Sequence, residues 1–410
     1  MLDAPNTVEF ASDVAVNVAT AMVSDPLEAF LIIVSVVCGL VWLSSLSQFK
    51  KVFKILPLLI WIILIPATLV GTGVLPSNLP LYINIGKVGL PLSLFYLIIS
   101  CNLKDIQKLG KPAIIAALSG TLGISIGGVI IVYLFATGEN ADLWKGFTVI
   151  SASWIGGTAN GAAVQQGLGA PASVIAPLAL MQTLMGFIWL IILISLAPHQ
   201  DKISKILGAT EPVLMDVTIE EEEVETKSLS LERFAGLIAL GFVSLIIAAG
   251  IGFSLPEFGD PKIITHATWV ILIISAMAIA IAAFKHEIIP TADASNLGYI
   301  FLYLMLATLG TQLNFSVIAD IGVYMVAGAL WLIIHLVILV AACRYFKLPT
   351  SMLALGSISN VGGIVTAPLI ASHYDRRLIP VALLMAVGTQ IIGIYLPFAL
   401  AAIFSQIALM

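Results

Sequence analysis

Two stretches of the chain carry the same pattern of small and polar residues. Residues 151–157 read Ser-Ala-Ser-Trp-Ile-Gly-Gly, and residues 357–363 read Ser-Ile-Ser-Asn-Val-Gly-Gly. Each glycine costs a helix up to about 1 kcal/mol relative to alanine, so we expect helices to break at both pairs and at the nearby Gly161. A broken helix exposes N–H groups that suit an anion and carbonyls that suit a cation.

Neutral polar side chains surround both glycine pairs, and discontinuous membrane helices use such groups to hold sodium and small solutes. The predicted substrate- and ion-binding residues are Ser151, Ser153, Gly156, Gly157, Thr158, Asn160, Gly161, Gln165, Ser357, Ser359, Asn360, Gly362, Gly363 and Thr366. Expected supporting residues are Asn102, Gln182, Gln312, His335 and Gln390. A coupling sodium ion is predicted near Asn160 and Asn360, with no other cofactor. The competing interpretation is that glycine and serine only let helices pack closely.

The elements that would position these residues are membrane helices. Of the 410 residues 60% are hydrophobic and 10% charged, and the mean hydropathy is +1.09. Crossing about 30 Å of hydrocarbon takes about 20 apolar residues. Apolar segments of this kind recur near 29–46, 55–75, 84–101, 112–136, 147–168, 173–197, 233–255, 266–285, 296–312, 321–343, 351–373 and 379–405. We therefore expect an all-α polytopic membrane protein surrounded by lipid.

A polar stretch divides these segments into two sets. Residues 199–232 contain the acidic run Glu220, Glu221, Glu222, Glu223 and Glu225, which is typical of a solvated linker. In each half the glycine-pair segment is the fifth of six, which indicates an internal repeat. The predicted parts are an N-terminal interfacial segment (1–28), a first membrane repeat (29–198), an acidic linker (199–232) and a second membrane repeat (233–410).

The distribution of Lys and Arg decides between two topologies, because positive charge stays on the cytoplasmic side. If both glycine-pair segments are re-entrant and the N-terminus is outside, 15 of the 18 Lys and Arg residues are cytoplasmic, leaving only Lys87, Lys145 and Lys262 outside. If every segment crosses, the charges divide 9 to 9, because Lys262 moves inside while seven residues move outside: Lys202, Lys205, Lys227, Arg233, Lys285, Arg344 and Lys347. The count favours the re-entrant topology.

That topology makes the two repeats inverted. Five crossings plus one re-entrant segment in each half force the second half to enter the membrane from the opposite side, which is the arrangement of many secondary transporters. The tips of the two re-entrant segments would then approach each other near the midplane. We expect the protein in the bacterial cytoplasmic (inner) membrane, with the N-terminus outside and residues 199–232 in the cytoplasm.

The scarcity of charge inside the segments limits the chemistry. No Asp or Glu lies in an apolar core, and His335 is the only ionisable side chain well inside a crossing. Proton coupling would rest on His335, whereas sodium coupling needs only neutral oxygens. An intramembrane enzyme would need a nucleophile with a base, or a set of metal ligands, so we predict no enzymatic activity. A passive channel between the two re-entrant tips is the alternative function to a transporter. The sequence has no basic cluster, so we predict no nucleic-acid partner.

Two resemblances follow from these motifs. Ser-Trp-Ile-Gly-Gly-Thr-Ala-Asn at 153–160, Ser-Asn-Val-Gly-Gly at 359–363 and the twelve-segment pattern resemble the YjcL-like family of bacterial and plastid membrane proteins of unknown function (domain of unknown function 819). A more distant likeness is to sodium-coupled glutamate and 2-hydroxycarboxylate symporters, whose inverted repeats each hold a re-entrant Gly-Gly-x-Gly loop. That likeness implies a homodimer with an elevator-type movement. The final glycine is replaced here by Ala159 and Val365, and neither loop has an Arg for a substrate carboxylate.

Together these observations predict a secondary active transporter. Its substrate would be a small solute, an organic anion or an amino acid, carried with sodium by alternating access of the elevator type.

Overall fold

The computed structural model describes residues 21–55, 58–77, 79–101, 106, 109–136, 142–209, 231–260, 262–285, 290–312 and 321–410. Within these ranges the chain is helical and forms no β-strand beyond one isolated bridge between Phe258 and Ile264. Nine helices of the described chain are long and apolar enough to cross a membrane. The predicted all-α, polytopic architecture is therefore confirmed.

The chain divides into two compact units. The first comprises Met1–Ser93 with Ser295–Ser316, and the second comprises Leu94–Ala294 with Val317–Met410. The described helices of the first are α2 (Pro26–Ser45), α3 (Lys50–Ile55), α4 (Leu58–Gly71), most of α5 (Pro80–Ile99) and most of α14 (Thr291–Gly310). Those of the second are α7 (Lys111–Phe135), α8 (Leu143–Gly156), α9 (Thr158–Leu168), α10 (Ala172–Leu196), α11 (Gln200–Leu207), α12 (Leu231–Ser254), α13 (His266–Lys285), α15 (Ile321–Tyr345), α16 (Thr350–Val361), α17 (Gly363–Tyr374) and α18 (Ile379–Ala408).

The predicted crossing segments correspond closely to these helices. Nine of them match α2, α5, α7, α10, α12, α13, α14, α15 and α18. The remaining one, 55–75, contains α4, which has 14 residues and an internal Pro66. The predicted division into halves at 199–232 stays a prediction, since residues 210–230 lie outside the described chain, as do the first 20 residues of the predicted N-terminal segment.

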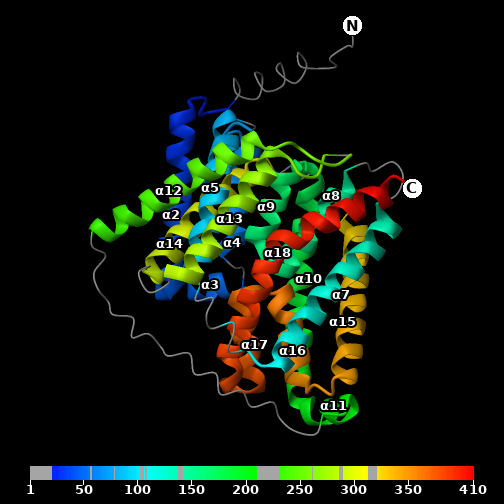
Figure 1. Ribbon diagram of the computed structural model, residues 1–410. Helices are drawn as coiled ribbons and strands as arrows, with labels where there is room; N and C mark the ends of the chain where they lie inside the picture. The colour runs from blue at the N-terminus through cyan, green and yellow to red at the C-terminus, as the bar shows by residue number, and fades with distance from the viewer. Residues whose placement is uncertain are drawn as a thin grey trace. The chain divides into compact units, whose positions relative to one another are not determined.

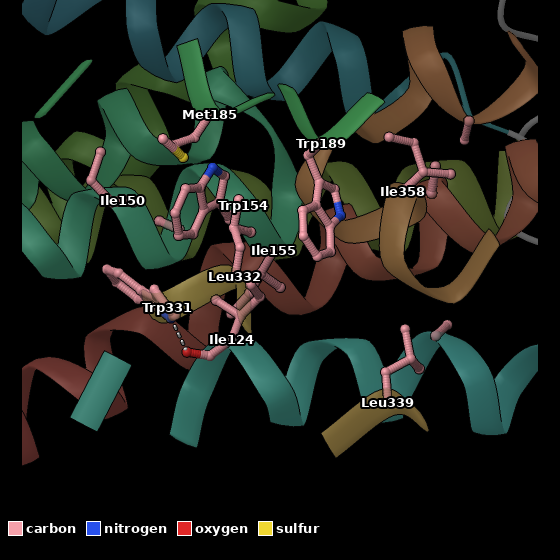
Figure 2. Packing of buried hydrophobic residues seen from close by; sticks show 14 of the residues in the cluster. Ile124, Ile150, Trp154, Ile155, Met185, Trp189, Trp331, Leu332, Leu339 and Ile358 are labelled. Carbon is pink, nitrogen blue, oxygen red and sulfur yellow. Dashed lines mark hydrogen bonds between the residues drawn. The ribbon is translucent and has the colours of Figure 1, made fainter. Parts of the chain in front are cut away.

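Close packing between α7 and α15 forms the frame of the second unit. A Cβ atom on Gly127 would lie 2.4 Å from Cδ1 of Trp331, and one on Gly123 would lie 3.0 Å from the Cα of His335. These glycines therefore let the two helices approach at the distance that small residues allow in membranes. The indole N–H of Trp331 donates to the carbonyl of Ile124 at 2.8 Å, which fixes the register of the pair (Figure 2).

Candidate functional site

The first glycine pair forms the tip of a helical hairpin, hairpin 1 (α8 and α9). Gly157 separates the two helices with φ 88° and ψ 171°, a conformation that is essentially restricted to glycine. A Cβ atom on Gly161 would lie 1.9 Å from Oγ of Ser153 and 3.3 Å from the carbonyl oxygen of Val149. In a continuous helix residues 149 and 161 would be about 18 Å apart. The chain therefore folds back on itself at Gly157.

Gly161 itself does not break the helix, so that part of the prediction is wrong. It lies inside α9, and the absence of a side chain makes room for Ser153 on the facing helix. The packing is reciprocal, because Asn160 of α9 lies over Gly156 of α8. A Cβ atom on Gly156 would be 1.9 Å from Nδ2 of Asn160. Polar side chains packed on glycines hold the two arms together.

The second glycine pair forms an equivalent hairpin, hairpin 2 (α16 and α17), with Gly363 at φ 66°. At its start, Thr350 Oγ1 donates to the carbonyl of Gln200 at 2.9 Å, and at its end Tyr374 Oη donates to that of Leu193 at 2.7 Å. Residues 193 and 200 belong to one continuous helical stretch and lie about 10 Å apart along it. A straight helix of the same length as hairpin 2 would separate its ends by about 36 Å. Both ends of hairpin 2 therefore lie at one end of α10.

The hairpins open at opposite ends of α10. Near the start of hairpin 1, a Cβ atom on Gly146 would lie 2.7 Å from Cγ1 of Val174, so this end meets the beginning of α10. The open end of hairpin 2 meets Leu193, which lies about 28 Å further along the same helix. In Figure 1, α8 and α9 accordingly lie toward one end of the second unit, and α16 and α17 toward the other, beside α11.

The tips of the hairpins meet on the first half of α18. Thr389 Oγ1 donates to the carbonyl of Ser359 in hairpin 2 at 2.8 Å. The carbonyl of the next residue, Gln390, accepts from Asn160 Nδ2 in hairpin 1 at 2.6 Å. Two consecutive residues of one helix therefore contact both hairpins within one turn of their tips. Close approach of α18 to the tip of hairpin 1 requires Gly393, where a Cβ atom would lie 2.7 Å from the backbone of Gly156.

Asn360 fastens hairpin 2 to α7. Its Oδ1 accepts from Thr121 Oγ1 at 2.8 Å, and its Nδ2 donates to the carbonyls of Ala117 at 3.1 Å and Gly356 at 2.9 Å. The side chain is fully buried, and both ends of its carboxamide have partners within the protein. Backbone contact is equally close, because a Cβ atom on Gly120 would lie 2.3 Å from the carbonyl oxygen of Gly356.

His335 forms a second fastening of hairpin 2. Its Nε2 lies 2.9 Å from Ser357 Oγ, and its Nδ1 lies 3.0 Å from the carbonyl oxygen of Gly120. Trp189 Nε1 donates to the same Ser357 hydroxyl at 2.8 Å. The carbonyl of Gly120 can only accept, so Nδ1 carries a hydrogen. In the neutral imidazole that full burial favours, Nε2 then accepts from the Ser357 hydroxyl. His335 thus joins α7, α15 and α16.

Unpaired polar atoms are concentrated in the hairpins. Among the described residues, four buried side-chain atoms have no hydrogen-bond partner in the protein, and three of them belong to the hairpins: Trp154 Nε1, Asn160 Oδ1 and Thr366 Oγ1. The fourth is Tyr82 Oη. Burying such a group without a partner in an apolar medium costs several kcal/mol, so its position marks a place where another partner is expected. Trp154 packs edge-to-face on Trp331, with ring centroids 5.0 Å apart (Figure 2).

The structure brings most of the predicted site residues into these two hairpins. Ser151 donates to Phe147 of its own helix at 3.0 Å, and Gln165 is buried on α9. Gln390 contributes its carbonyl, while Gln182 lies partly buried on α10. Gln312 belongs to the first unit, and Asn102 lies outside the described residues.

The predicted site did not include the residues that fasten the hairpins: Thr121, Thr389 and Trp189. Thr121 and Thr389 also bond to carbonyls of their own helices, which is what an isolated threonine in an apolar segment does by default. No sequence signal separates the two roles. Their partners are Asn360, Ser359 and Ser357, which were identified only because residues 357–363 repeat the motif of residues 151–157.

These features define an integral membrane protein in which two helical hairpins meet on one long helix. The family model for the "Protein of unknown function (DUF819)" family matches residues 30–407, and the chain belongs to this family. It is also similar to the "Uncharacterized membrane protein YjcL" of Bacillus subtilis (strain 168), with 23% identity over 346 residues, which cover 79% of this chain and 84% of the relative.

Proposed function

We propose that the protein is a secondary active transporter for a small solute, built from two inverted repeats. The observation that carries the proposal is the meeting of the two hairpin tips on consecutive residues of α18. The hairpins open at opposite ends of α10, as re-entrant segments of inverted repeats would. A site at such a meeting point is reached from either side of the membrane by movement of the elements around it.

The polar groups at the tips fit a solute that carries a carboxylate. The indole N–H of Trp154, three residues before Gly157, is a buried unpaired donor. At the tip of hairpin 1, α9 begins with N–H groups that suit an anion. The unpaired oxygens of Asn160 and Thr366 suit a cation. An organic anion carried with sodium, or an amino acid, satisfies both kinds of group. On this proposal the movement is of the elevator type and the unit of function is a homodimer in the bacterial inner membrane.

Transport is tested with the purified full-length protein in proteoliposomes. A panel of radiolabelled carboxylates and amino acids is offered with an inward sodium gradient, with a potassium gradient and with no gradient. We expect saturable uptake of at least one solute that accumulates only with the sodium gradient. Flux that does not saturate and ignores every gradient would indicate a passive channel and refute the proposal.

The inverted arrangement is tested by labelling. In a protein whose native cysteines (Cys38, Cys101 and Cys343) are replaced by serine, a single cysteine is placed at Asp142, before hairpin 1, or at Arg376, after hairpin 2. An impermeant maleimide applied to intact cells should label the first position and not the second. Labelling of both from the same side contradicts the inverted arrangement.

A further inference from the structure

The two unpaired hairpin oxygens occupy matched positions. Asn160 follows Gly156 by four residues, as Thr366 follows Gly362. In each hairpin this side chain lies over the first glycine of the pair, since a Cβ atom on Gly156 would be 1.9 Å from Asn160 Nδ2 and one on Gly362 would be 1.9 Å from Thr366 Oγ1. The structural repeat is therefore Gly-Gly-x-x-(Asn or Thr). The counterpart of Asn160 is Thr366, and the residue aligned with Asn360 is Trp154.

The orientation of the Asn160 carboxamide is fixed by its neighbour. Nδ2 donates to the carbonyl of Gln390 at 2.6 Å, and the reverse orientation would place two oxygens against each other. The atom left without a partner is therefore an acceptor on a side chain that is 0% exposed. An acceptor in this position is satisfied by a hydrogen-bond donor or by a cation.

The absence of carboxylates favours a cationic partner of low charge. Asn160 lies in the first turn of α9 and packs on Gly156, the last residue of α8, so both the free N–H groups of α9 and the free carbonyls of α8 flank it. Neither hairpin contains an Asp or Glu. Calcium and magnesium sites are built largely on carboxylates, whereas a monovalent cation or an ammonium group is held by neutral oxygens.

We propose that Asn160 Oδ1 and Thr366 Oγ1 are the ligands, one from each hairpin, for a cationic group: a sodium ion or the ammonium group of the solute. This proposal rests on the proposed transport function and specifies its cation ligands. Asn360, whose carboxamide is fully bonded to Thr121, Ala117 and Gly356, is assigned to holding hairpin 2 in place.

The test measures thermal stability of the purified full-length protein in detergent. The apparent melting temperature is recorded in sodium, potassium or methylammonium chloride at equal ionic strength, because a ligand that binds only the folded state raises it in a saturable way. The variants are Asn160→Leu, Asn160→Asp and Thr366→Val. Thr121→Val is the matched control, because it removes a hydroxyl that already has a partner in the protein.

We expect one cation, sodium or methylammonium, to raise the melting temperature of the native protein above its value in potassium. Sodium alone identifies the coupling ion, and methylammonium alone identifies an ammonium group of the solute. The rise in melting temperature should be lost in Asn160→Leu and in Thr366→Val. It should persist in Asn160→Asp, which keeps an oxygen at this position. It should also persist in Thr121→Val, in which only the melting temperature without the cation is lower. Equal melting temperatures in all three salts, or an undiminished rise in either Asn160→Leu or Thr366→Val, would overturn the assignment.

The result is separable from the transport assay. Gradient-driven uptake with no cation effect on stability refutes these ligands and leaves the transporter proposal standing. A cation effect that depends on Asn160 and Thr366, in a protein that transports nothing, keeps the site and refutes the transporter.

Discussion

Replacing Asn360 by leucine should destabilise the protein by about 2 kcal/mol. The substitution removes three hydrogen bonds while keeping the number and branching of the side-chain heavy atoms, and such bonds in a membrane protein average about 0.6 kcal/mol each. No further penalty for an unpaired group is expected. The carbonyls of Ala117 and Gly356 lie in helices, and the Thr121 hydroxyl also bonds to Ala117 at 3.2 Å. The loss should therefore stay close to the sum of the bonds.

The assay is reversible unfolding in mixed micelles with a graded denaturing detergent, in which the free energy of unfolding is compared between variants. Thr121→Val removes one of the three bonds and also leaves Asn360 Oδ1 buried without a partner, so it should lower the free energy of unfolding by about 1–3 kcal/mol. The double variant should be less destabilised than the sum of the single variants by about the same amount, because the two residues share a bond. An Asn360→Leu protein as stable as the native protein would refute the view that this carboxamide fastens hairpin 2 to α7.

Three further predictions follow from the contacts. Gly120→Ala should lower the free energy of unfolding by about 1–3 kcal/mol or more, because the new Cβ atom would lie 2.3 Å from a backbone carbonyl oxygen. Gly236→Ala, whose Cβ atom would have nothing within 4 Å, should be neutral or stabilising by up to about 1 kcal/mol. Unfolding titrations compare the two variants. His335→Gln should leave the pH profile of solute uptake unchanged, since the imidazole serves as a neutral hydrogen-bonding group between Gly120 and Ser357; a flattened profile would restore proton coupling through His335. Outside the membrane segments, hydrogen bonds from Lys262 and from the His266 amide lower the pKa of Glu257. The contribution of Glu257 to stability is therefore present above the ordinary carboxyl pKa and is lost as the pH falls through the lowered pKa. Melting curves of Glu257→Gln below about pH 4 should lack this loss of stability.

The sequence by itself determined the membrane character and the approximate helix boundaries. Long apolar runs can satisfy their backbone groups in lipid only as helices, so composition and length fix the secondary structure locally. The glycine pairs at 156–157 and 362–363 were identified as breaks for an equally local reason. Gly157 and Gly363 adopt positive φ values that residues with a side chain rarely adopt.

The tertiary structure decided which polar residues have partners. Asn160 and Asn360 are the same residue type in similar motifs, yet one leaves its oxygen unpaired and the other bonds at both ends. The difference lies in Thr121 and Ala117, which precede Asn360 in the sequence by more than 200 residues and approach it only because glycines let α7 and α16 touch. Local sequence specifies a conformation, but hydrogen bonds between helices depend on which surfaces meet, and that is set by packing across the whole unit.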